Sequence, residues 1–137
     1  STSGVAREER YPALSLAELL SWADVVSIHC PLNARTRNLI GAPELKIMKR
    51  SAILINVARG GIVDEAALAT ALDRGSIAGA ALDVFTQEPL AADNPLTHIA
   101  APDRILLSPH NAWSPVEAVE VLVGCIERNI TEFCNRQ

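Results

Sequence analysis

Four short apolar runs, each closed by a turn or a proline, constrain the fold of this chain more than any other feature of its sequence. They span four to eight residues each and lie at 24–30, 52–57, 77–84 and 105–108. Short apolar runs of this kind are typical of strands that are buried on both faces. Segments with helical patterns alternate with them, at 16–23, 43–49, 65–74 and 116–133. The alternation predicts an α/β fold, in which a doubly wound parallel sheet is covered by helices on both faces.

Capping residues mark where the helices begin. Ser15 and Glu18 form a capping box before the first helix, and Asp64 caps the helix over 65–74, which Gly75 ends. Ser114 and Glu117 predict a second capping box, with the intervening proline at the first helical position. The helix that follows carries one apolar stripe, expected to face a core or a partner, made of Val116, Val119, Val123, Ile126, Ile130 and Phe133.

Composition excludes several classes of function. The formal net charge is −4, and without a basic patch the sequence offers no electrostatic argument for nucleic-acid binding. No apolar run approaches the roughly 20 residues that a membrane span needs. The three cysteines are expected to be reduced thiols in a cytoplasmic protein, and they and the histidines lack the spacing of a metal site. Because the chain does not begin with Met, it is expected to be a piece of a longer protein.

Charged residues follow three of the predicted strands, where ligands bind in open parallel sheets. Arg59 lies after the second strand, Asp83 and Glu88 at and after the end of the third, and His110 after the fourth. An imidazole can give or take a proton near neutral pH, and a neighbouring carboxylate fixes its tautomer. An arginine fork can bind a carboxylate. Together these groups suit the reduction of a 2-keto acid by a cofactor that supplies hydride.

Each of these residues also has a purely structural interpretation. Arg59 can be a surface residue beside a turn, and Asp83 can cap a loop by accepting hydrogen bonds from backbone N–H groups. Glu88 can be a solvated loop residue, and His110 a loop histidine that bonds to backbone carbonyls.

Four ordered motifs give the sequence a recognisable resemblance over most of its length, from about residue 15 to the last helix. The chain resembles the D-isomer-specific 2-hydroxyacid dehydrogenases, whose NAD(P)-binding domain has a Rossmann-type fold. The matching stretches are DVVSIHCPL at 24–32, INVARGGIVD at 55–64, ALDVFTQEPL at 81–90 and LSPHNAW at 107–113. The HNAW form is similar to the glycerate dehydrogenase-like, hydroxypyruvate reductase-like and C-terminal-binding-protein-like branches.

The resemblance implies a role for each matching residue. Arg59 corresponds to the arginine that orients the substrate, His110 to the acid/base, and Glu88 to the acid that pairs with it. Asp83 corresponds to the residue that bonds the nicotinamide carboxamide of NAD or NADP. The other positions that the resemblance places near the cofactor are Cys30, Pro31, Thr36, Val57 and Ala58, besides Arg59 and His110 themselves. Trp113 would lie near the substrate or pack under the histidine loop. A homodimer of the full-length protein is also implied.

The sequence departs from the family at its beginning. It has no Gly-x-Gly-x-x-Gly turn for the cofactor's pyrophosphate, and the acidic residue that distinguishes NAD from NADP would precede Ser1. Residues 1–137 are therefore expected to be a truncated NAD(P)-binding domain that lacks its first two strands, with no substrate-binding domain. If the run at 24–30 is the third strand in the order 3-2-1-4-5-6, the two missing strands would lie between it and the next run. The gap between these two runs would then be about 10 Å wider than in normal strand pairing. Partial folding, aggregation or distortion is then expected.

Three functions remain open at this point. The first is a catalytic fragment of an NAD(P)-dependent 2-hydroxyacid dehydrogenase, which transfers hydride between the cofactor and a small 2-keto or 2-hydroxy acid and is inactive on its own. The second is a non-catalytic, NAD(H)-sensing module similar to a corepressor. The third is an inactive truncated product.

Overall fold

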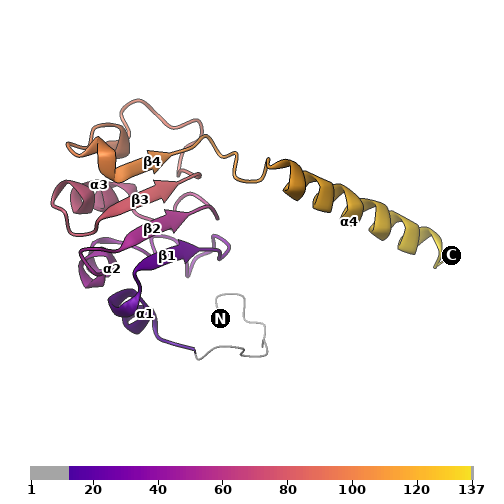
Figure 1. The fold of residues 1–137 in the computed structure, drawn as a ribbon, viewed down its shortest axis with the longest axis horizontal. Helices are drawn as coiled ribbons and strands as arrows, with labels where there is room; N and C mark the ends of the chain where they lie inside the picture. The colour runs from indigo at the N-terminus through magenta and orange to yellow at the C-terminus, as the bar shows by residue number, and fades with distance from the viewer. Residues whose placement is uncertain (1–12, 137) are drawn as a thin grey trace.

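The computed structural model describes residues 13–136 as a parallel sheet with helices on one face and a long helix that extends from one edge (Figure 1). The strands are β1 (Val25–Ile28), β2 (Ile53–Asn56), β3 (Gly79–Leu82) and β4 (Ile105–Leu107). The α-helices are α1 (Leu16–Trp22), α2 (Ala42–Ile47), α3 (Glu65–Asp73) and α4 (Val116–Cys134). Two 3₁₀ turns, η1 (Pro95–Thr97) and η2 (Pro102–Arg104), lie in the proline-rich stretch before β4. The predicted α/β class and parallel sheet are confirmed.

The strands pair in chain order, β1-β2-β3-β4, and every pair is parallel. Val25 lies opposite Ile53, and Ile53 lies opposite Gly79. The predicted gap between the first two strands is therefore wrong, because they are hydrogen-bonded neighbours. The four described strands thus form one continuous parallel sheet in chain order. The expectation of partial folding, aggregation or distortion rested on that gap, and it stays a prediction that this pairing does not support.

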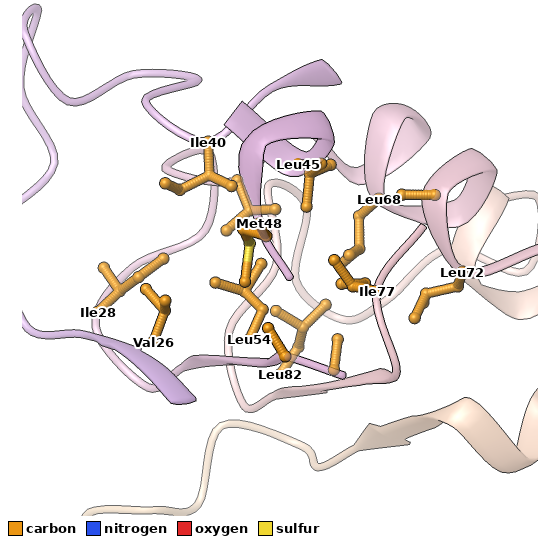
Figure 2. Close-up of a cluster of buried hydrophobic side chains, with 14 of the residues drawn as sticks. Val26, Ile28, Ile40, Leu45, Met48, Leu54, Leu68, Leu72, Ile77 and Leu82 are labelled. Atoms are coloured by element: carbon orange, nitrogen blue, oxygen red, sulfur yellow. The ribbon is translucent and has the colours of Figure 1, made fainter. Parts of the chain in front are cut away.

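Apolar residues on one side of the sheet form the core beneath α1, α2 and α3. Val26, Ile28, Leu54 and Leu82 are buried and point toward Leu45, Met48, Leu68 and Leu72 of the helical layer (Figure 2). Alternate residues of each strand face the other side, where Val25 is 56 % exposed and Leu106 is 67 % exposed. The prediction of helices on both faces is thus wrong for the described residues.

The apolar stripe of α4 is not covered by other residues between 13 and 136 either. All six stripe residues predicted to face a core or a partner are exposed, and α4 buries none of its residues. The helix extends away from the sheet rather than across it (Figure 1). None of the described helices is long and apolar enough to cross a membrane.

Two of the three predicted caps are present. Ser15 and Glu18 form the reciprocal capping box of α1, and Asp64 accepts the N–H of Ala67 at the start of α3. The capping box at Ser114 is wrong: the N-cap of α4 is Pro115, without a side-chain hydrogen bond. The hydroxyl of Ser114 instead donates to the carbonyl of Asn111 at 2.7 Å, because the chain turns just before this helix.

Candidate active site

The loops that follow the strands meet at the carboxyl edge of the sheet, where the sequence placed its charged residues. His110 Nδ1 lies 2.7 Å from Glu88 Oε2, although 22 residues separate the two in the chain. Both side chains are partly open to solvent, with 39 % of the imidazole and 36 % of the carboxyl side chain exposed. The structure thus joins an imidazole and a carboxylate that both the strand-end positions and the resemblance had brought together.

Glu88 is held from its other side by the backbone. Its Oε1 accepts the N–H of Phe85 at 3.0 Å. The hydrogen bond from His110, and then that from Phe85, lower the pKa of Glu88 below its ordinary value. An ionised Glu88 accepts a hydrogen bond from Nδ1–H, which fixes the tautomer of His110 and leaves Nε2 as the nitrogen that can exchange a proton.

Asp83, directly after β3, is buried and bonded to the loop that carries His110. Its Oδ1 accepts hydrogen bonds from Ser108 Oγ at 2.6 Å and from the N–H of Asn111 at 2.9 Å, while Oδ2 accepts the N–H of Ala112 at 2.9 Å. Burial acts to raise the pKa of Asp83, but these hydrogen bonds outweigh it and the pKa is lowered. The structural interpretation, in which Asp83 caps a loop, describes each of these hydrogen bonds of its carboxylate.

This lowered pKa predicts an acid-dependent loss of stability. The contribution of Asp83 to folding is fully present above the unfolded pKa of about 3.9 and is lost as the pH falls through the lower folded value. Asp83→Asn is therefore expected to be less stable than the wild type at neutral pH, by an amount that shrinks in acid. Urea unfolding at a series of pH values measures this difference. A constant difference between about pH 6 and about pH 3 would contradict it. Asp93→Asn, at an exposed loop position, serves as the control.

Arg59 lies on the neighbouring loop, after β2. Asn56, at the end of that strand, is 1 % exposed and fixes the turn: its Nδ2 donates to the carbonyl of Arg59, and its Oδ1 accepts the N–H of Ala58. The guanidinium is exposed and donates to the Ala58 carbonyl at 2.7 Å. Arg59 is thus free to turn toward a ligand, and its hydrogen bond in this structure is local.

Gly60 lies in the turn that contains Arg59 (the arginine turn) and brings it against the loop that carries Glu88. A Cβ at this position would overlap the Phe85 carbonyl and lie 2.6 Å from the N–H nitrogen of Thr86. Only glycine allows the two backbones to approach this closely. Gly60 is thus required by contact, whereas its neighbour Gly61 has a positive φ angle of +77°.

Glu65 is a site residue that sequence reasoning missed. From the first turn of α3, its Oε1 accepts the N–H of Thr86 and its Oε2 accepts Asn94 Nδ2, both at 2.6 Å. It therefore fixes the loop that carries Glu88. Its sequence signal, an acidic residue directly after an N-cap, resembles ordinary helix-dipole complementarity and does not reveal the long-range bond.

A pocket of about 660 Å³ lies beside this cluster, at the carboxyl ends of β1 and β2. It is lined by most of the residues predicted to contact the cofactor: Cys30, Pro31, Val57, Ala58 and Arg59, together with His29 and Leu32. None of the described residues that line the pocket is a carboxylate, and Arg59 gives it a positive charge, which suits an anionic ligand.

Thr36 and Trp113 lie elsewhere than in this pocket. Thr36 is fully buried, and its hydroxyl donates to the Pro31 carbonyl and accepts the N–H of Asn33, so that it folds its own loop. The indole N–H of Trp113 donates to the His110 carbonyl at 2.9 Å, with the residue 65 % exposed. Trp113 therefore braces the histidine turn from outside rather than packing beneath it.

The sequence of this chain is similar to a known protein family and to several named enzymes. Residues 2–112 match the family model of the D-isomer specific 2-hydroxyacid dehydrogenase NAD binding domain. The chain is 47 % identical over 120 residues to glycerate dehydrogenase of Methylorubrum extorquens, covering 88 % of this chain and 38 % of that protein. It is 54 % identical over 119 residues to glyoxylate reductase of Aeropyrum pernix, a match that covers 87 % of this chain and 35 % of that protein.

Solved structures agree with the sequence comparison. The NAD-complexed D-isomer specific 2-hydroxyacid dehydrogenase of Lactobacillus delbrueckii ssp. bulgaricus superposes with a TM-score of 0.72 at 35 % identity, over 87 % of this chain and 39 % of that one. An acyclic imino acid reductase in complex with NADPH and D-Arg superposes with a TM-score of 0.79 at 30 % identity. The match covers 95 % of this chain and 42 % of the reductase. The chain thus spans well under half the length of these relatives.

Proposed function

Because the chain belongs to the D-isomer specific 2-hydroxyacid dehydrogenase family, in which it matches the NAD-binding domain, we propose that it carries the proton-transfer and carboxylate-binding residues of a 2-keto acid reductase. The observation that carries the proposal is the 2.7 Å contact between His110 Nδ1 and Glu88 Oε2 at the carboxyl edge of the sheet. A proton donor held by a carboxylate is what the reduction of a carbonyl requires. The substrate class is a small 2-keto acid or its 2-hydroxy counterpart.

The residues of the site suit the expected cofactor. The pocket lies where open parallel sheets bind nucleotides, and its lining of small side chains and one arginine fits an anionic dinucleotide. Cys30, Pro31, Val57 and Ala58 would contact it mainly through backbone and apolar surface. When bound, the reduced nicotinamide supplies hydride to the keto carbon.

The protein residues handle the charge and the proton. Arg59 turns outward to bind the substrate carboxylate with its guanidinium fork. His110 donates a proton from Nε2 to the keto oxygen, so that the carbonyl becomes a hydroxyl while its carbon gains the hydride. Glu88 stays ionised, stabilises the imidazolium before the transfer, and holds the ring in one tautomer afterwards.

Activity in this proposal needs segments that the sequence does not contain. The pyrophosphate turn and the substrate-binding domain of the family would precede Ser1 or follow Gln137, and a homodimer would form in the full-length protein. Residues 1–137 are in that case the second part of an NAD(P)-binding domain. On its own, the chain would hold the reacting groups without closing over the substrate.

Joining the chain to the missing segments of a relative tests this proposal. We expect a chimera with the remaining parts of the Methylorubrum glycerate dehydrogenase to oxidise NADH or NADPH when glyoxylate or hydroxypyruvate is added. The fall in absorbance of the reduced cofactor measures the rate. A folded chimera that binds the cofactor but turns over neither acid would instead favour the NAD(H)-sensing module. A folded chimera without cofactor binding would favour an inactive product.

A further inference from the structure

The turn that carries His110 has a backbone conformation that most residues avoid. The φ angle of His110 is +53°, and among the described residues other than glycine only Asn38 shares a positive value. L-residues rarely adopt this left-handed region, so a non-glycine residue stays there only when surrounding contacts hold it. The turn also sets the direction of the imidazole, since rotating the backbone out of this region would carry the ring away from Glu88.

The contacts that hold the turn converge on Asp83. Its carboxylate accepts the Ser108 hydroxyl on one side of His110 and the N–H groups of Asn111 and Ala112 on the other. Asp83 is itself fixed by the sheet, because its own N–H donates to the Asn56 carbonyl at 3.0 Å. With Asp83 only 3 % exposed, these bonds are sheltered from water.

We propose that Asp83 is a positioning residue, whose carboxylate fastens the turn over 108–112 and thereby holds His110 against Glu88. This differs from the role that the resemblance implies, in which Asp83 bonds the nicotinamide carboxamide. A carboxylate offers about four acceptor positions, and the turn occupies three of them. One position remains for a further donor, so contact with the cofactor is compatible with the proposal and is not needed by it.

The catalytic meaning of this role rests on the proposed function of His110, but its geometry can be tested without any activity. In the 137-residue chain free of ligands, NMR can record the resonances of the His110 ring nitrogens at one fixed pH. Glu88→Gln is expected to shift these resonances in the wild-type background, because the partner of Nδ1 loses its charge. In Asp83→Asn, which cannot accept the N–H of Ala112 through its amide nitrogen, the shift is expected to be lost. An equal shift in both backgrounds would overturn the proposal.

Serine variants keep the test decisive if Asp83→Asn does not fold. Ser108→Ala removes one donor to Asp83 and is expected to reduce the shift, whereas Ser108→Thr keeps the hydroxyl and should restore it. Ser114→Ala is the matched control, because this serine lies in the same loop and its hydroxyl donates to the Asn111 carbonyl rather than to Asp83. An equal loss of the shift in Ser114→Ala and Ser108→Ala would also overturn the proposal.

A second measurement separates this inference from the proposed function. In the active chimera, Ser108→Ala is expected to lower kcat by roughly tenfold to a hundredfold and leave the cofactor Kd unchanged, because a misplaced ring affects only the reacting step. If Asp83 acted solely on the cofactor, Asp83→Asn would weaken cofactor binding while the His110–Glu88 coupling persisted, which contradicts positioning. If the parent chimera shows no turnover, the proposed function fails and the NMR result still decides the role of Asp83.

Discussion

Replacing His110 with alanine is expected to reduce kcat of the active chimera by about a hundredfold to ten-thousandfold, the usual contribution of a positioned acid/base. The side chain removed is the one whose Nδ1 lies 2.7 Å from Glu88, and alanine leaves no group that can protonate the keto oxygen. Cofactor affinity is expected to change little, because the pocket lined by Cys30 and Val57 lies on neighbouring loops. Steady-state kinetics and a cofactor titration measure the two quantities separately.

His98→Ala provides the matched control for this prediction. His98 is an exposed loop residue that ends η1, and its removal is expected to leave kcat near the wild-type value. The kcat of Glu88→Gln is expected to lie between those of His110→Ala and His98→Ala, because glutamine keeps the shape of the partner of His110 and removes its charge. Turnover by His110→Ala at the wild-type rate would end the acid/base assignment.

Gly60→Ala is expected to lower the free energy of unfolding by about 3 kcal/mol, at the upper end of the usual cost of overpacking. The new methyl group would meet the backbone of Phe85 and Thr86, which cannot turn aside as a flexible side chain can. This steric overlap can be relieved only if the arginine turn and the loop that carries Glu88 move apart. Thermal and denaturant unfolding measure the loss, and activity of the chimera should fall with it.

Gly124→Ala is the control for the steric argument. A Cβ at Gly124, within α4, has no atom within 4 Å apart from its own helix and chain neighbours. Alanine is also the better helix former, by about 1 kcal/mol in a helix interior. This variant is therefore expected to be no less stable than the wild type. If Gly60→Ala behaved like it, close backbone contact at Gly60 would not be the reason for glycine there.

The sequence was most informative where local chemistry decides the structure. Alternating apolar runs and helical segments predicted every strand and α-helix that the structure describes, because periodicity and capping act over a few residues. The candidate residues at the strand ends were found for the same reason, since parallel strands direct the loops at their carboxyl ends to one edge. His110 and Glu88 did meet at that edge.

Errors arose where the answer depends on neighbours that a sequence does not display. Numbering the run at 24–30 as the third strand produced a gap that the pairing of Val25 with Ile53 removes. Burial on both faces was inferred from apolar strands, yet an apolar side chain such as Leu106 does not specify what covers it. The contacts of Asp83 and Glu65 span more than 20 residues and follow from the fold alone.

The pairing of β1 with β2 also bears on how the sheet can form. Val25 and its partner Ile53 are 28 residues apart, and the later pairs, such as Ile53 with Gly79 and Ala80 with Ile105, are separated by 26 and 25 residues. Each strand thus closes a loop of nearly the same length, at nearly the same entropic cost. No described strand has to wait for one from a distant part of the chain. From β1 to β4, the sheet can therefore grow by one crossover at a time in chain order.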